Sequence, residues 1–158
     1  MRQRVYIETS VVSYLTARPT RDLVSAARQA ITREWWQGKR AELDLFTSQV
    51  AIEEARQGDP EGAARRLEIL AAIPKLEVTS DAIALARALV KAGVLPRTAV
   101  TDALHIAVAT LGSVDILLTW NCRHLANASF IEPVAALLRK RGHKPPIVCT
   151  PEYVLGEP

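Results

Sequence analysis

The sequence is poor in several features that define common classes of protein. Only 5% of its 158 residues are aromatic, and its two cysteines are too few for a disulfide framework. No apolar run approaches the roughly 18 residues of a membrane span, and no signal-like apolar segment follows the N-terminus. We therefore expect a globular protein that acts in a reducing cytoplasm and does not enter the membrane.

The seven glycines do not form the loops that bind nucleotides. Neither G-x-G-x-x-G nor G-x-x-x-x-G-K-[ST] occurs, which argues against the usual dinucleotide-binding and nucleotide-triphosphatase classes. The G-x-S-x-G elbow of α/β-hydrolases is missing as well. Cys122 and His124 form one C-x-H pair, but without a second pair we interpret Cys122 as a packed thiol and not as a metal ligand.

Positive charge is in slight excess. Twenty Lys and Arg residues against 17 Asp and Glu give a net charge of +3, which is too small to indicate a polyanionic partner. One basic run, at residues 139–144, is typical of a solvated helix C-terminus, where cations are favoured. A phosphate-binding edge is the alternative interpretation, and it gains weight if the protein has a nuclease site.

Strand-like and helix-like segments alternate along the chain. Short apolar runs predict strands at residues 5–7, 45–47, 76–78, 116–118 and 147–149. Helices are predicted between them, at residues 11–15, 22–37, 49–57, 101–111 and 130–141 among others. This alternation predicts a parallel sheet covered by helices on both faces, in a single domain over residues 1–158.

Polar residues gather where these strands end and helices begin. They are Glu8, one of Glu53 and Glu54, Asp102, and Asn121. Neighbouring helical residues point about 100° apart, so at most one of the two adjacent glutamates faces the others. In open parallel sheets, ligands bind at the carboxyl edge, which is the edge where we expect these side chains to meet.

The chemistry of this set points to a metal ion. Clustered carboxylates repel one another unless a cation neutralises them, and oxygen ligands suit Mg²⁺ or Mn²⁺. Such an ion supports phosphodiester hydrolysis. Structural interpretations compete with this one: Asp102 suits the dipole of a helix N-terminus, Asn121 suits a turn, and Thr9 or Ser10 suits the cap of the helix at residues 11–15.

Four short segments occur in an informative order. They are Val5–Ser10, Ser48 with Glu54 and Gly58, Asp102–Ala107, and Leu118–Asn121. Together they resemble the motifs of PIN domains, especially the ribonuclease toxins of VapC type. The resemblance implies a three-layer α/β/α sandwich with a short parallel sheet, and an endoribonuclease that depends on Mg²⁺ or Mn²⁺. It also implies a homodimer and a cognate antitoxin protein that blocks the site.

The same resemblance implies that Glu8, Glu54, Asp102 and Asn121 are the catalytic and metal-binding residues. Glu8 stands where the family usually has Asp, and its side chain is one methylene longer. Asn121 stands where a fourth Asp is common, and it keeps an oxygen ligand but lacks the negative charge.

Other polar and aromatic residues receive structural assignments. His105, three residues beyond Asp102, is expected to hydrogen-bond to backbone or a carboxylate and not to act as a base. His124 is expected to be solvated at the surface, with contact to an RNA backbone as the alternative. Trp35 and Trp36 cannot share one helix face, so one of them is expected in the core, and the other is expected to cap the surface or meet a second subunit.

Two other functions fit the same residues. The altered site of a PIN-like module could bind RNA or protein without cutting, and a metal titration would separate that function from a nuclease. A structure-specific DNA nuclease is the other alternative, which parallel assays on RNA and DNA would separate.

Overall fold

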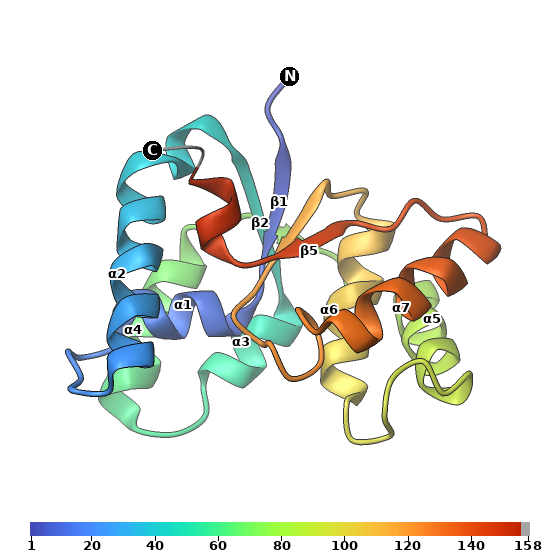
Figure 1. Cartoon of the computed structure of the whole chain (residues 1–158), viewed down its shortest axis with the longest axis horizontal. Coiled ribbons are helices and arrows are strands. Elements are labelled where there is room, and N and C mark those ends of the chain that lie inside the picture. The colour runs from blue at the N-terminus through green and yellow to red at the C-terminus, as the bar shows by residue number, and fades with distance from the viewer. Residues whose placement is uncertain (156–158) are drawn as a thin grey trace.

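A five-stranded parallel sheet lies between two layers of helices in the computed structural model, which describes residues 1–155 (Figure 1). The strands are β1 (Arg4–Ile7), β2 (Asp44–Ser48), β3 (Lys75–Leu76), β4 (Ile116–Leu118) and β5 (Ile147–Cys149). Their order is β3-β2-β1-β4-β5, with β1 at the centre. The predicted α/β/α sandwich is therefore confirmed. The predicted single domain also includes residues 156–158, which lie outside the described residues.

Helices cover both faces of this sheet (Figure 1). Helices α1 to α4 pack on one face and α5 to α7 on the other. Their bounds are α1 (Thr9–Thr16), α2 (Leu23–Gly38), α3 (Gln49–Ala55), α4 (Pro60–Ala71), α5 (Ser80–Lys91), α6 (Val100–Leu111) and α7 (Ala128–Lys140), with short 3-10 helices η1 (Arg40–Glu42) and η2 (Pro151–Val154). Within residues 1–155, no helix has the length and apolar character needed to cross a membrane.

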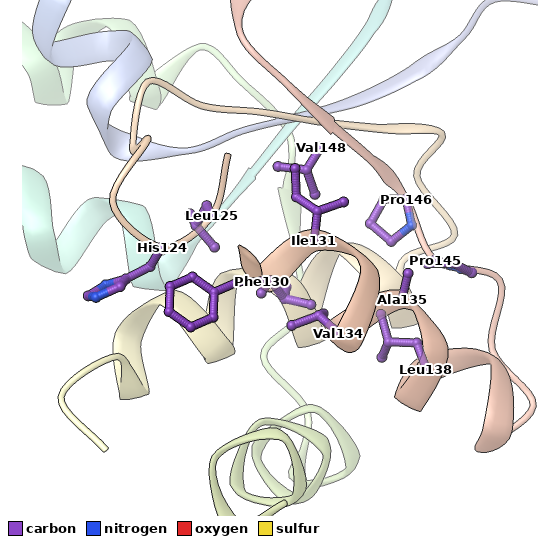
Figure 2. Close-up of a pocket in the computed structure, with 11 residues that line it drawn as sticks. His124, Leu125, Phe130, Ile131, Val134, Ala135, Leu138, Pro145, Pro146 and Val148 are labelled. Carbon is purple, nitrogen blue, oxygen red and sulfur yellow. The ribbon is translucent and has the colours of Figure 1, made fainter. Parts of the chain in front are cut away.

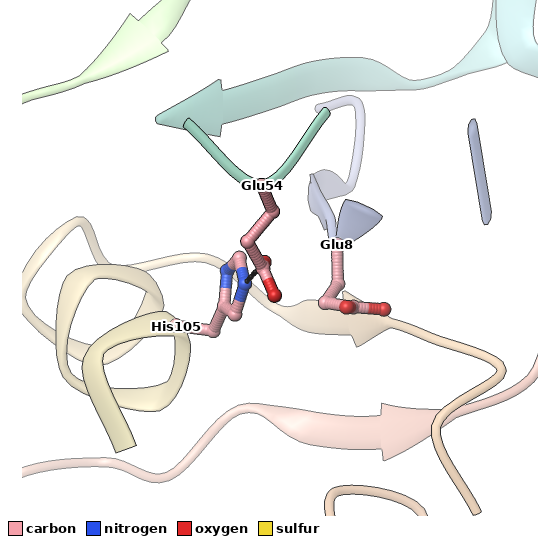
Figure 3. Close-up of side chains that lie close together, drawn as sticks. All are labelled: Glu8, Glu54 and His105. Carbon is pink, nitrogen blue, oxygen red and sulfur yellow. Dashed lines mark hydrogen bonds and ion pairs between the residues drawn. The ribbon is translucent and has the colours of Figure 1, made fainter. Parts of the chain in front are cut away.

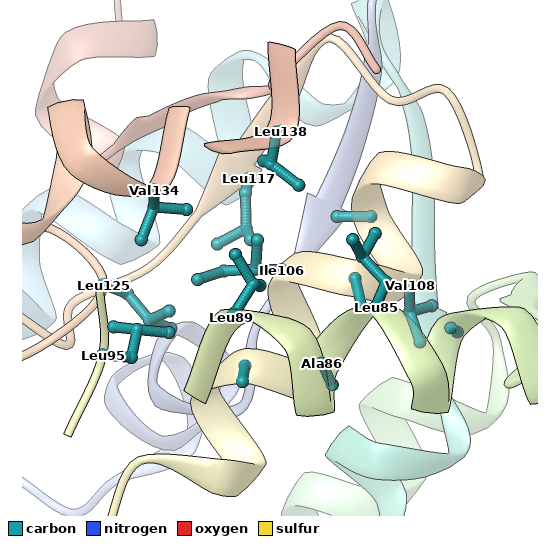
Figure 4. Close-up of a cluster of buried hydrophobic side chains, with 14 of the residues drawn as sticks. Leu85, Ala86, Leu89, Leu95, Ile106, Val108, Leu117, Leu125, Val134 and Leu138 are labelled. Atoms are coloured by element: carbon teal, nitrogen blue, oxygen red, sulfur yellow. The ribbon is translucent and has the colours of Figure 1, made fainter. Parts of the chain in front are cut away.

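The side chains of the central strands alternate between two cores. Val5 and Ile7 of β1 pack with α1 to α4, whereas Tyr6 between them packs with α5 to α7, and all three are 0% exposed. Figure 4 shows the second core, a cluster that includes Leu117 of β4, Leu89 of α5 and other apolar side chains. Burial on both faces explains why these strands are continuously apolar in the sequence.

The start of α1 differs from the predicted one, because the cap is a different residue. We expected Thr9 or Ser10 to cap a helix at residues 11–15. Instead the helix begins at Thr9, and the carboxylate of Glu8 is the cap, accepting a hydrogen bond from the backbone N–H of Ser10 at 3.0 Å. A structural role for a carboxylate directly after β1 therefore exists beside any chemical one.

The third strand also differs from the predicted one. A strand was predicted at residues 76–78, but β3 is Lys75–Leu76, because Lys75 pairs with Thr47 and Leu76 with Ser48. The chain then leaves the sheet, and Thr79 caps α5 by accepting a hydrogen bond from the N–H of Ala82 at 3.1 Å.

Strand register brings the ends of β1 and β4 to one edge of the sheet. Ile7 of β1 pairs with Leu118 of β4, and the backbone N–H of Glu8 donates to the carbonyl of Leu118 at 3.1 Å. The residues that follow, Glu8 and Thr119, therefore start side by side. Helix α3 begins directly after β2 on the same edge, which carries Glu54 toward them.

Candidate metal centre

Glu8 is held from one side of its carboxylate. The residue is 4% exposed, and Oε2 accepts hydrogen bonds from the backbone N–H of Ser10 at 3.0 Å, from the hydroxyl of Ser10, and from the hydroxyl of Thr119 at 2.8 Å. All three hydrogen bonds that Glu8 accepts within the described residues go to this oxygen. The arrangement fixes the carboxylate and leaves Oε1 for another partner.

Of the two adjacent acids on α3, Glu54 faces Glu8 and Glu53 does not. Oε1 of Glu54 accepts hydrogen bonds from the hydroxyl of Thr9 at 2.7 Å and from Nε2 of His105 at 2.5 Å. Glu53 lies at the surface and pairs with Arg56 at 2.9 Å. The geometry thus places Glu54 in the candidate site.

His105 lies at the centre of a buried hydrogen-bond chain. Its side chain is 0% exposed, and Nδ1 is 2.7 Å from Oη of Tyr6, which is in turn 2.7 Å from Oγ of Ser48. With the bond to Glu54, the chain joins α6, β1, β2 and α3. The expected hydrogen bond between His105 and a carboxylate is confirmed. Its second partner is Tyr6, which was predicted only as part of a strand.

The ionisation of these groups reflects burial and mutual attraction. Burial alone would raise the pKa of Glu54, but the hydrogen bond and charge of His105, with the bond from Thr9, hold that pKa below its usual value. Burial alone would lower the pKa of His105, but the bond to Glu54 and the charges of Glu8, Glu54 and Asp102 raise it. Burial raises the pKa of Tyr6, so its hydroxyl stays protonated.

Glu8, Glu54 and His105 form a group with the spacing of a metal site. One potential ligand atom from each lies within 4.8 Å of the other two (Figure 3). Ligands about 2.1 Å from one octahedral ion stand about 3 to 4 Å apart, so small side-chain adjustments suffice. The three residues therefore fit a divalent ion through two carboxylates and one imidazole nitrogen.

Asp102 and Asn121 contact each other and lie outside that group. Oδ1 of Asp102 accepts a hydrogen bond from the amide of Asn121 at 3.1 Å, and Oδ2 is 2.8 Å from Nδ1 of His124. Oδ1 of Asn121 accepts the backbone N–H groups of Arg123 and His124 at 3.2 and 3.1 Å. The four predicted site residues are thus divided between two neighbouring groups.

The expectation that His124 is solvated at the surface is wrong. Its side chain is 17% exposed, and the ring of Phe130 packs edge-on against it, 5.8 Å between centroids. Figure 2 shows His124 at one end of the side chains that line an apolar hollow beside α7. Asn121 caps a turn that brings His124 back toward Asp102. An Asn three residues before the His is typical of such a turn, so the sequence contained a signal for this contact.

The fold is that of solved VapC structures. VapC20 from Mycobacterium tuberculosis, described as a Sarcin-Ricin loop cleaving toxin, matches with a TM-score of 0.60 and 17% identity over 75% of this chain and 91% of that chain. A chain of VapBC2 from Rickettsia felis, solved bound to a DNA fragment from their promoter, matches with a TM-score of 0.52 and 12% identity over 94% and 98%.

At these identities the likeness concerns the fold. Neither a protein-family model nor a curated protein matches the sequence. The chain has the PIN-like α/β/α fold of VapC toxins, as its motifs predicted.

Proposed function

We propose that this protein is a metal-dependent endoribonuclease and the toxin of a type II toxin–antitoxin pair. The observation that carries the proposal is the set of carboxylates at the carboxyl edge of a parallel sheet, in a fold shared with VapC20. VapC20 is described as cleaving the Sarcin-Ricin loop, which supports RNA as the class of substrate.

In this proposal Glu8, Glu54, Asp102 and Asn121 are the metal-binding and catalytic residues, and the ion is Mg²⁺ or Mn²⁺. The bound ion would activate water and stabilise negative charge on a phosphoryl oxygen. Thr9 and Thr119 orient the carboxylates of Glu54 and Glu8, to which they donate. Asn121 orients the carboxylate of Asp102, to which its amide donates.

Cleavage of a mixed single-stranded RNA pool tests the activity. We expect products in Mn²⁺ or Mg²⁺ and none with a chelator, and we expect Glu54→Gln to abolish cleavage while the matched surface variant Glu53→Gln preserves it. Duplex and flapped DNA are assayed in parallel. Cleavage of DNA alone would identify a DNA nuclease, and a folded protein that binds no Mn²⁺ at millimolar concentration would identify a binding module.

The partner in this proposal is a cognate antitoxin that inserts an arginine between the carboxylates. A guanidinium suits them geometrically and electrostatically. VapBC2 is named as a complex, which supports a second protein for chains of this fold. Co-expression with the adjacent open reading frame and a pull-down at low salt test the pairing, and failure to copurify contradicts it.

The proposal also includes a homodimer in the cytoplasm. The proposed interface is centred on Leu23 and Val24 of α2 and not on a tryptophan. Trp35 is fully buried, and Trp36 is partly buried with the guanidinium of Arg40 4.3 Å from its ring. The large apolar side chains that α2 exposes are Leu23 and Val24, at 84% and 60%. Sedimentation is expected to show twice 17.3 kDa, and Leu23→Asp to give a monomer.

A further inference from the structure

We infer that His105 supplies a nitrogen ligand to the ion held by Glu8 and Glu54, and that the site therefore prefers Mn²⁺ to Mg²⁺. The inference rests on the proposed function for the presence of a metal, and it adds the ligand set and the class of ion. The potential ligand atoms of these three residues come together within 4.8 Å (Figure 3).

The first support is the orientation of the imidazole ring. Nδ1 of His105 is fixed 2.7 Å from Oη of Tyr6, and the same oxygen is 2.7 Å from Oγ of Ser48. Histidine ligands in metalloproteins have their second nitrogen held in this way, which sets the tautomer and aims the first nitrogen at the ion. The ring is fully buried, and hydrogen bonds at both nitrogens hold its orientation.

The second support is what Nε2 faces. It lies 2.5 Å from Oε1 of Glu54, a distance at which an ionised carboxylate accepts a hydrogen bond from an Nε2–H group. A divalent ion would replace the Nε2 proton once the two atoms separate to about 3 Å: the Nε2–H bond breaks, the proton leaves to solvent, and the nitrogen lone pair binds the ion. The ring stays neutral because Nδ1 then carries the N–H and donates it to Oη of Tyr6. Oε1 of Glu8, which accepts no hydrogen bond from residues 1–155, completes the three ligands.

The third support concerns Asp102 and Asn121, whose side-chain oxygens an all-oxygen site would need as ligands. Both oxygens of Asp102 accept hydrogen bonds, from Asn121 and His124, and the oxygen of Asn121 accepts two backbone N–H groups. An ion bound by Asp102 or Asn121 would have to replace or share these hydrogen bonds. Mg²⁺ takes oxygen ligands in a strict octahedron, whereas imidazole suits first-row transition ions, so a nitrogen ligand shifts the preference toward Mn²⁺.

Pulsed electron paramagnetic resonance of Mn²⁺ bound to the full chain tests the ligand directly. We expect modulation from a directly bound ¹⁴N, which changes to the ¹⁵N pattern when wild-type protein is labelled with [¹⁵N]histidine. The labelling requires no variant to fold. The chain has three histidines. His124→Gln and His143→Gln are expected to keep the coupling, and His105→Gln is expected to lose it while its circular dichroism stays native.

Calorimetry gives a second measure. The wild type is expected to bind Mn²⁺ at least about 10-fold more tightly than Mg²⁺, with the ratio falling toward one in His105→Gln. Bound Mn²⁺ without nitrogen coupling would overturn the inference and leave His105 as a residue that only positions Glu54. Coupling that disappears in His124→Gln would overturn it as well, and absence of bound Mn²⁺ at millimolar concentration would overturn both the inference and the proposed metal dependence.

RNA cleavage by the same samples separates this inference from the proposed function. A protein with nitrogen-coupled Mn²⁺ that does not cut RNA keeps the ligand set and loses the nuclease. A protein that cuts RNA in Mn²⁺ without nitrogen coupling keeps the nuclease and loses the ligand set.

Discussion

The carboxylates in the two halves of the candidate site accept hydrogen bonds in different ways. In the Glu54 group (Glu8, Glu54 and His105), the hydrogen bonds to each acid go to one oxygen, Oε2 of Glu8 and Oε1 of Glu54. In the Asp102 group (Asp102, Asn121 and His124), both oxygens of the acid have a partner. Each acid of the Glu54 group therefore keeps one oxygen that accepts no hydrogen bond from residues 1–155. Both oxygens of Asp102 already have a hydrogen-bond partner.

This difference explains both departures from the motif. Glutamate at position 8 is long enough to reach back to Ser10 and cap α1 while its carboxylate still meets Thr119. Asparagine at position 121 can donate a hydrogen bond to Asp102 at 3.1 Å, which an ionised aspartate could not do. Each departure thus has a structural role in its own group.

The largest expected effect comes from breaking the Glu54 group. Glu54→Gln removes a ligand charge and the partner of a fully buried imidazole. We expect RNA cleavage to fall by more than about 100-fold. Loss of a residue that only supports a ligand typically lowers activity by about 10- to 100-fold. Metal-free stability should fall by about 1–2 kcal/mol, since Glu54 is partly exposed.

Cleavage rates and thermal melting measure both effects. Glu53→Gln is the matched control, because Glu53 sits one residue earlier on α3 and faces solvent. Equal rates for the two variants would show that Glu54 is no ligand.

The next largest effect is expected from Asp102→Asn. The change removes the charge of a proposed metal ligand, so cleavage should fall by about 100-fold. An amide also offers one acceptor to the two donors of Asn121 and His124, so metal-free stability should fall by about 1 kcal/mol. Asp81→Asn is the control, because Asp81 is also an acid in a first helical turn but is exposed. If Asp102 served only the helix dipole, the two variants would lose similar stability and neither would lose activity.

The sequence predicted the part of the site that depends on periodicity. Apolar runs placed β1 and β4 and therefore the edge where Glu8 and Asn121 lie, and the helical pattern placed Asp102 in the first turn of α6. The resemblance selected Glu54 over Glu53, and the fold placed it on the inner side. These features depend on local pattern and on general rules of parallel sheets.

The sequence did not reveal contacts between distant side chains. Tyr6 was predicted only as part of a strand, because nothing in the neighbouring sequence shows that its hydroxyl reaches Ser48 and His105, 42 and 99 residues away. His124 was predicted to lie at the surface, because its burial depends on Phe130 of α7 and on Asp102 of α6. The start of β3 was missed because pairing with β2, and not composition, sets it.

A smaller effect on activity is expected when the support of the Glu54 group is removed. Tyr6→Phe deletes the oxygen between Ser48 and His105 and leaves both without that partner in a buried place. We expect a loss of about 1–3 kcal/mol in stability and less than about 10-fold in cleavage. Denaturant unfolding measures the first, and Tyr153→Phe, at an exposed position, is the control. A variant as stable as wild type would mean that the chain from Ser48 to His105 is not formed.

The smallest expected effect comes from giving the Asp102 group the charge that it lacks. Asn121→Asp places a carboxylate where an amide now donates to Asp102, so the metal-free protein should lose about 1 kcal/mol through repulsion and the lost hydrogen bond. Bound Mn²⁺ should offset this loss, and its affinity should rise a few-fold, because the new acid is an added ligand charge.

The measurement for this variant is the melting temperature with and without Mn²⁺. Asn127→Asp is the matched control, since Asn127 caps α7 and aspartate caps a helix equally well. The difference between the two groups predicts a larger metal-induced stabilisation for Asn121→Asp than for wild type. An unchanged stabilisation, together with an unchanged metal-free melting temperature, would mean that position 121 lies beyond the influence of the ion and that the Glu54 group alone forms the metal centre.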